Sequence, residues 1–297
     1  MRKNLKPYLE LMRMKNWLGY FLMASLGFVI SRGFLFPLKD IIIFYTTVIL
    51  LFGFVFSIND CFDTKEDKLD KDKKNPIVLE RINLKQGLAF SVFLAISGLA
   101  LSMVLGLKVF LLFFTTIVFA FLYSAPPVRM KGRPLLDLFS HGLFAGALIF
   151  LIPVLVFNNQ LTFFHYLIAF SLFYFSITLE IRNHIEDYET DKKAGLKTTV
   201  GALGPKNSEK LLRYLALIYP LTLFPIFLIL KGMENPGSGQ RPLFLSVSQC
   251  LLLFSVFTVF FIFFFLFRKN HKLVKNYRIM DLYANLSFVL VSILMIL

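Results

Sequence analysis

Long apolar runs separated by short polar stretches make up most of this sequence. Nine of them, bounded by charged residues or by Gly, Pro and Asn, are long enough to predict membrane-spanning helices. The predicted spans are residues 16–34, 41–58, 87–107, 109–124, 135–157, 161–179, 211–230, 243–267 and 280–297. Lys108 alone separates the third and fourth runs, which predicts a tight hairpin at that residue, because a single helix of that combined length would be far too long for a bilayer.

The composition supports an all-α polytopic membrane protein. Of the 297 residues, 57% are hydrophobic and 17% are charged, and the mean hydropathy is +0.70. Soluble domains carry about 25% charged residues, so this composition excludes a soluble enzyme and a disordered chain. The two cysteines, Cys61 in a charged loop and Cys250 in an apolar run, provide no disulfide framework.

Lys and Arg are distributed unevenly between the two sides of the predicted spans. In this arrangement 27 of the 32 basic residues lie on one side of the membrane and five on the other. Because loops rich in Lys and Arg remain in the cytoplasm, we expect a cytoplasmic N-terminus and an external C-terminus. The net charge of +14 then reflects topology and attraction to anionic lipids, and it requires no nucleic-acid partner. The chain is thus expected in the cell membrane as a multi-pass protein.

Two short acidic stretches follow the second and sixth predicted spans, both on the cytoplasmic side. Residues 59–67 and 183–191 share the pattern Asn-x-x-x-Asp-x-x-x-Asp. Residues four apart lie on one face of a helix, so each stretch predicts a stripe of three polar side chains. The stripes consist of Asn59, Asp63 and Asp67, with Asp60 on the flank, and of Asn183, Asp187 and Asp191.

The carboxylates of these stripes are candidate ligands of a metal ion. Like charges on one face are unfavourable unless cations lie between them, and oxygen ligands without His or Cys favour Mg²⁺. A solvent-facing charged loop would explain either stretch alone, but the shared spacing on one membrane side favours a common site. Four spans separate the two stretches, which predicts two parallel four-helix halves, about 13–134 and 135–279, and a ninth helix, 280–297, in a single domain of residues 1–297.

A basic loop follows the fourth span on the same side. Tyr123 begins the run Tyr-Ser-Ala-Pro-Pro, and Arg129 and Lys131 follow the helix-stopping prolines. The cations either bind a diphosphate or simply obey the preference for basic cytoplasmic loops, and Tyr123 is equally explained as an interfacial anchor. The same two interpretations apply to Arg13, Lys15 and Asn16 before the first span, and to Lys192, Lys193 and Lys197.

Together these patterns resemble the UbiA superfamily of intramembrane prenyltransferases. The family's first motif, Asn-Asp-x-x-Asp-x-x-x-Asp, is matched at positions 59, 60, 63 and 67, and its second, Asp-x-x-x-Asp, at 187 and 191. The run from Tyr123 and residues 187–198 also resemble members of this family. The resemblance extends from Arg13 to about Gly204, and nine spans are the usual number in the family.

The resemblance implies an enzyme that transfers an isoprenyl group from a prenyl diphosphate to a lipophilic acceptor and releases diphosphate, with Mg²⁺ as cofactor. The implied metal ligands and catalytic residues are Asp63, Asp67, Asp187 and Asp191, with Asn59 and Asp60 as further ligands. The implied substrate-binding residues are Asn59, Asp60, Asn183, Arg129, Lys131, Tyr123 and Asn16. Metal ions would withdraw charge from the leaving group, and an apolar, aromatic site would protect an allylic cation from water.

Departures from the family pattern leave the class of acceptor open. Arg13 is followed by Met14 where an Arg-Pro pair is common, and Glu80 stands where a Gly is frequent. The acceptor is therefore a quinone precursor, an ether lipid, a carotenoid or a tetrapyrrole. The alternative function is a polytopic transporter with cytoplasmic acidic motifs, against which the middles of the spans are nearly free of charge. His184, which lies off the second stripe, is interpreted as an ordinary hydrogen-bonding residue, and Cys61 as a small filler.

Overall fold

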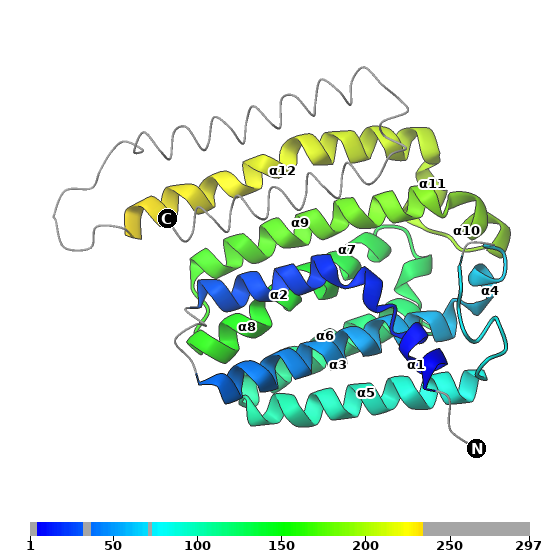
Figure 1. Ribbon diagram of the computed structural model, residues 1–297. Helices are drawn as coiled ribbons and strands as arrows, with labels where there is room; N and C mark the ends of the chain where they lie inside the picture. The colour runs from blue at the N-terminus through cyan, green and yellow to red at the C-terminus, as the bar shows by residue number, and fades with distance from the viewer. Residues whose placement is uncertain (1–4, 32–36, 71–72, 234–297) are drawn as a thin grey trace. The chain divides into compact units, whose positions relative to one another are not determined.

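The computed structural model describes residues 5–31, 37–70 and 73–233, and all regular elements among them are helices. The chain divides into two compact units, residues 1–216 and 217–297, and the fold below concerns the first (Figure 1). Helix α12 (Pro205–Met233) covers the seventh predicted span. The eighth and ninth predicted spans lie outside the described residues.

Five described helices are long and apolar enough to cross a membrane, and they correspond to the second to sixth predicted spans. They are α3 (Leu38–Phe62), α5 (Leu84–Val104), α6 (Leu107–Ser124), Leu136–Asn158 and α9 (Phe163–Glu186). The fourth of these is composite: α7 (Leu136–Gly142), a π-helical turn (Leu143–Ala147) and α8 (Leu148–Asn158). The first predicted span contains the shorter apolar helix α2 (Leu18–Ile30). An all-helical, multi-pass architecture is thus confirmed over these residues, and the number nine and the orientation stay predictions.

The hairpin between the third and fourth spans lies two residues before its predicted position. Helix α5 ends at Val104, and the chain turns at Gly106, whose φ of 117° is readily adopted only by glycine. Lys108 already lies in the first turn of α6, and its Nζ donates to the carbonyl of Asn159 at 3.1 Å. The turn is therefore determined by the backbone freedom of Gly106 and not by the charge of Lys108.

Small residues bring the helices that carry the acidic stretches close to their neighbours. A Cβ atom on Gly87 of α5 would lie 2.9 Å from Sγ of Cys61 on α3, so neither position has room for a larger side chain. Likewise, a Cβ atom on Gly146 in the π-helical turn would lie 2.6 Å from the carbonyl oxygen of Leu172 on α9. Cys61 is buried, in agreement with its interpretation as a small filler.

The elements that carry most of the predicted site residues lie at one end of the first unit (Figure 1). Figure 1 shows that α1 (Lys6–Leu11), α4 (Thr64–Asp67) and α10 (Tyr188–Ala194) lie at the end where α3 and α9 finish. Both acidic stretches therefore lie at the same end of the bundle, as the parallel direction of their spans predicted. Helix α11 (Thr199–Leu203) lies at this end as well.

We expect cysteines placed at Lys68 and Lys193 to react with a membrane-impermeant thiol reagent from the cytoplasmic side, and a cysteine at Asn159 to react from the outside. All three positions are exposed, and basic loops remain in the cytoplasm. Labelling of intact cells and of inverted vesicles, with Cys250 replaced by Ser, measures the sidedness. Reaction of Lys68→Cys and Lys193→Cys from opposite sides would contradict the common location of the two acidic stretches.

Candidate functional site

Both motif helices break at the central Asp of their acidic stretch. Asp63 ends α3 and precedes α4, and Asp187 ends α9 and precedes α10. At each break the N–H of the Asp donates to the carbonyl four residues earlier at 2.9 Å, and its own carbonyl accepts from the N–H four residues later at 2.8 Å. The four-residue spacing of the backbone hydrogen bonds therefore persists through both breaks.

The carboxylate of Asp63 is buried between two cations from the loop after α6. Lys131 Nζ lies 2.5 Å from Asp63 Oδ2, and an Arg129 Nη lies 3.1 Å from Asp63 Oδ1 and 2.9 Å from Glu66 Oε1. Only 1% of the Asp63 surface and 8% of the Lys131 surface are exposed. A buried charge requires such pairing. Arg129 and Lys131 are therefore not simply solvent-exposed residues of a basic loop.

A third cation reaches the first stretch from the N-terminal segment. The Arg13 guanidinium pairs with Asp60 and lies 3.5 Å from Asp67. Arg13 and Arg129 both adopt left-handed backbone conformations, with φ of 47° and 38°. Such conformations are uncommon for residues other than glycine, and strained backbone is frequent at functional sites. Arg13, whose role the sequence left open, is thus part of the cluster.

Lys73 joins the two acidic stretches. Its Nζ lies 3.3 Å from Asp67 Oδ1 and 3.5 Å from Asp187 Oδ2. A second connection runs from α4 to α10, because Lys65 Nζ donates to the carbonyl of Ala194 at 2.6 Å. The two acidic stretches, which are offset by 124 positions in the sequence, therefore lie next to each other, as predicted. The contribution of Lys73 was not predicted, because nothing local distinguishes it from the other basic residues of its loop.

Burial and charge pairing shift the pKa values of this cluster in opposite directions. Burial alone would raise the pKa of Asp63, but the Lys131 ammonium outweighs this effect and lowers it. The pKa of Lys131 is raised, because the pull of Asp63 exceeds the cost of burial. Burial raises the pKa of Asp191 to about 6, and the nearby charges of Lys131 and His184 compensate only in part. A further cation beside Asp191 would therefore stabilise its ionised form.

The acidic stretches fit Mg²⁺ by the chemistry of their donors. Among the described residues, no three His, Cys, Asp or Glu side chains are gathered closely enough to hold a metal ion without other ligands. Mg²⁺, however, commonly takes one or two protein carboxylates and completes its shell with water and phosphate oxygens. Asp191 Oδ2 is buried and has no hydrogen-bond partner, so it is a carboxylate oxygen with free acceptor capacity.

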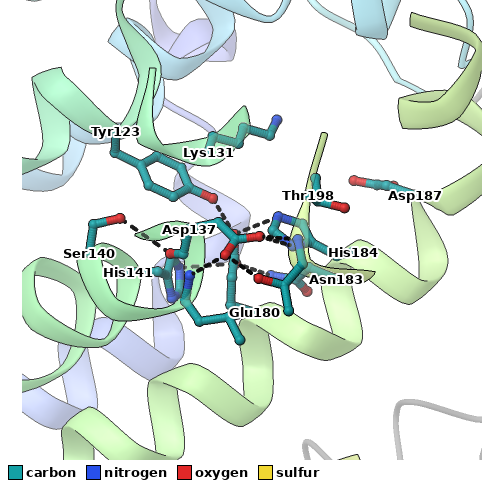
Figure 2. A network of polar contacts seen from close by, with 12 residues as sticks. Tyr123, Lys131, Asp137, Ser140, His141, Glu180, Asn183, His184, Asp187 and Thr198 are labelled. Atoms are coloured by element: carbon teal, nitrogen blue, oxygen red, sulfur yellow. Dashed lines mark hydrogen bonds and ion pairs between the residues drawn. The ribbon is translucent and has the colours of Figure 1, made fainter. Parts of the chain in front are cut away.

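A second polar network, shown in Figure 2, lies beside the second acidic stretch and was not predicted. Glu180 Oε1 accepts a hydrogen bond from the Tyr123 hydroxyl and lies 3.0 Å from His184 Nε2, and Glu180 Oε2 lies 3.4 Å from His141 Nε2. His184 Nδ1 lies 3.4 Å from Asp137 Oδ2. The spacing of Glu180 and His184 could have indicated their contact, but no sequence pattern points to Asp137.

The remaining predicted site residues lie at the edges of these two clusters. Asn59 Nδ2 donates to Ser124 Oγ at 3.4 Å, and Asn183 Nδ2 donates to Glu180 Oε2 at 3.2 Å. Tyr123 is buried against Glu180, so it is not an interfacial anchor. Asn16 is exposed in a short turn before α2. The structure thus brings most of the predicted residues together, and their roles toward a metal or substrate stay predictions.

Comparison with known families identifies the class of enzyme to which this site belongs. The model of the UbiA prenyltransferase family matches residues 20–283. The chain belongs to this family. The resemblance inferred from the motifs is thereby confirmed, and the protein is a prenyltransferase, which rules out the alternative of a transporter.

Similar proteins support the same assignment. Digeranylgeranylglyceryl phosphate synthase of Saccharolobus solfataricus is 31% identical over 233 residues, which cover 74% of this chain and 78% of that protein. The enzyme of the same name from Sulfolobus acidocaldarius is 31% identical over 216 residues, 69% of this chain and 72% of that protein. A UbiA homologue of Archaeoglobus fulgidus, solved with GPP and Mg²⁺, shares the fold with a TM-score of 0.70 at 23% identity, over 98% of this chain and 96% of that chain.

We expect Lys131→Met to lower the stability of the folded protein by about 3 kcal/mol, because it leaves the buried Asp63 carboxylate with only part of its counter-charge. Arg133→Met, an exposed neighbour in the same loop, should have little effect. Unfolding of the purified protein in detergent measures both. Adding Asp63→Asn to Lys131→Met should restore part of the lost stability, and strictly additive losses would contradict the pairing.

Proposed function

We propose that this prenyltransferase catalyses the Mg²⁺-dependent transfer of an isoprenyl group from a prenyl diphosphate to a membrane lipid with a glyceryl phosphate head. The C1–O bond of the prenyl diphosphate breaks, C1 becomes bonded to the acceptor oxygen, and diphosphate and the proton of the acceptor hydroxyl are released. The main structural support for this type of reaction is that carboxylate oxygens of both acidic stretches lie near one ammonium group: Lys73 Nζ is 3.3 Å from Asp67 Oδ1 and 3.5 Å from Asp187 Oδ2.

In this proposal the two acidic stretches bind the metal ions. Asp63 and Asp67 would hold one Mg²⁺, with Asn59 and Asp60 assisting, and Asp187 and Asp191 would hold another. When bound, these ions would withdraw charge from the leaving diphosphate. The free oxygen of Asp191 and the oxygen-only donor set support this assignment.

The basic side chains are proposed to bind the phosphate groups. Lys131 and Arg129 enter the cluster from one loop and Lys73 from another, and each lies against a carboxylate of the proposed metal site. Their charges would both orient the diphosphate and stabilise the negative charge that develops on it. Arg and Lys bind phosphate oxygens through charge-assisted hydrogen bonds, which are about twice as strong as neutral ones.

The names of the similar proteins support the proposed acceptor. Both archaeal relatives described above are digeranylgeranylglyceryl phosphate synthases and are 31% identical to this chain over more than two thirds of its length. An ether lipid was one of the acceptors that the sequence left open. We further propose that the site faces the cytoplasm, in keeping with the excess of basic residues in the loops that form it.

We expect Asp63→Asn and Asp187→Asn each to reduce transfer by at least about 10³-fold while the protein still inserts into the membrane, because each removes a charged ligand and preserves the shape of the side chain. Glu189→Gln is the matched control, since Glu189 lies in the same acidic stretch but is exposed. Release of diphosphate by the purified protein, titrated with Mg²⁺ after treatment with EDTA, measures the effect. Near-normal turnover of either Asn variant at saturating Mg²⁺ would refute the two-metal assignment.

We expect membranes that contain the protein to convert a prenylated glyceryl phosphate, but not a hydroxybenzoate or a naphthoate, into a product heavier by one prenyl group. Mass spectrometry of products from C10 to C20 prenyl diphosphates and an acceptor panel identifies both substrates. The Asp63→Asn variant is the blank for background activity. Transfer to an aromatic acid alone would keep the reaction type and reject the proposed acceptor.

A further inference from the structure

Most of the second acidic stretch lies within residues 185–198, a connection that contains helix α10 and that we call the loop. The two ends of this loop lie beside one buried carboxylate. Asp137, in the first turn of α7, is 0% exposed. Its Oδ2 lies 3.4 Å from Nδ1 of His184, just before the loop, and accepts the backbone N–H of Thr199, just after the loop, at 2.6 Å. Asp137 therefore connects the two ends of residues 185–198, which include both acids of the second motif.

The Asp137 carboxylate is occupied on both oxygens. Oδ1 accepts the Thr199 hydroxyl at 2.5 Å and the N–H of Leu138 at 2.8 Å. The Thr199 oxygen in turn accepts the N–H of Leu135 at 2.7 Å, which fixes the entry of α7 to the exit of the loop. A buried carboxylate that is hydrogen-bonded on both oxygens rigidifies its surroundings.

The contact with His184 extends this connection to two further helices. Figure 2 shows His184 beside Asp137 and Glu180; its Nδ1 lies 3.4 Å from Asp137 Oδ2 and its Nε2 lies 3.0 Å from Glu180 Oε1. Glu180 in turn binds Tyr123 at the end of α6. The base of the loop is thus connected to α6, α7 and α9, and Asp187 lies just three residues beyond His184.

The first acidic stretch is closed by an independent contact of the same kind. Asn75 is buried, and its Nδ2 donates to the carbonyl oxygen of Asp60 and to Asp67 Oδ2, both at 2.8 Å. Its Oδ1 accepts the N–H of Ile77 at 2.9 Å. For each acidic stretch, one buried polar side chain thus connects the two ends of the segment that contains it.

We propose that Asp137 is a positioning residue that holds the second acidic segment in the geometry required to bind Mg²⁺ and the diphosphate. This inference rests on the metal site proposed above, and it assigns a function to a residue that contacts neither metal ligand of the second motif in the described structure. Loss of the Asp137 contacts would release the segment at its base and leave the ligands themselves intact.

The test compares two variants of the full-length protein with a matched control. Asp137→Asn retains the shape of the side chain and loses its charge, and Thr199→Val removes only the bridging hydroxyl. Ser176→Ala is the control, because Ser176 Oγ lies 3.0 Å from His141 Nδ1 in the same helix pair but does not contact the loop. The three variants therefore separate the closure of the loop from a general loss of buried hydrogen bonds.

Hydrogen–deuterium exchange of the purified protein gives a readout that does not depend on activity. We expect exchange at residues 185–199 to accelerate about tenfold or more in Asp137→Asn and in Thr199→Val, the change that a loss of about 1.4 kcal/mol produces. Exchange in α5 should not change. Unchanged exchange at 185–199 in both variants, or an equal acceleration in Ser176→Ala, would overturn the proposal.

Kinetics then connect the loop to ligand binding. We expect the half-saturating Mg²⁺ concentration and the KM for prenyl diphosphate to rise about tenfold in Asp137→Asn, with the acceptor KM unchanged within about twofold. Rapid exchange with unchanged Mg²⁺ dependence would overturn the role of Asp137 in positioning. If instead Asp187→Asn retains transfer, the proposed metal site fails, and the exchange data still decide whether Asp137 closes the loop.

Discussion

Buried carboxylates require cations, and this requirement determines how the connecting segments at one end of the helix bundle are arranged. Asp60, Asp63 and Asp67 are almost completely buried at the end of an apolar bundle, where unpaired charges are strongly unfavourable. Their counter-charges come from separate connecting segments, with Arg13 before α2, Lys73 after α4, and Arg129 and Lys131 after α6. Each loop is therefore held where its cation meets a carboxylate.

The two acidic stretches differ in the cations that pair with their carboxylates. Arg13, Lys73, Arg129 and Lys131 pair with carboxylates of the first stretch, and Lys73 also pairs with Asp187 of the second. Both stretches retain a buried carboxylate oxygen without a hydrogen-bond partner, Glu66 Oε2 in the first and Asp191 Oδ2 in the second. The neighbours of the second stretch are the histidine and carboxylate side chains around Glu180. The two acidic stretches thus share a backbone pattern, with a helix break at the central Asp, while their charge environments differ.

Local patterns predicted the helices and the motif residues, and long-range contacts account for what was missed. Hydropathy located the spans because bilayer thickness imposes a length on each apolar run. The four-residue spacing grouped Asp63 with Asp67, and the grouping holds because the i to i+4 backbone hydrogen bonds continue through the helix break at Asp63. Lys73 and Asp137 could not be predicted this way. Lys73 reaches Asp187 and Asp137 reaches Thr199, which lie 114 and 62 residues away along the chain, and the sequence neighbours of Lys73 and Asp137 carry no distinguishing pattern.

The π-helical turn at Leu143–Ala147 explains how one membrane span serves two different neighbours. Each residue of an α-helix advances the side-chain direction by about 100°, so the wider turn, with its i to i+5 hydrogen bonding, changes the angular phase between α7 and α8. Helix α7 can direct Asp137 and His141 toward α9, while α8 packs its apolar side chains on α2. A single regular helix would keep both sets of side chains in one fixed rotation. The polar contacts with α9 and the apolar packing on α2 would then compete for the same face.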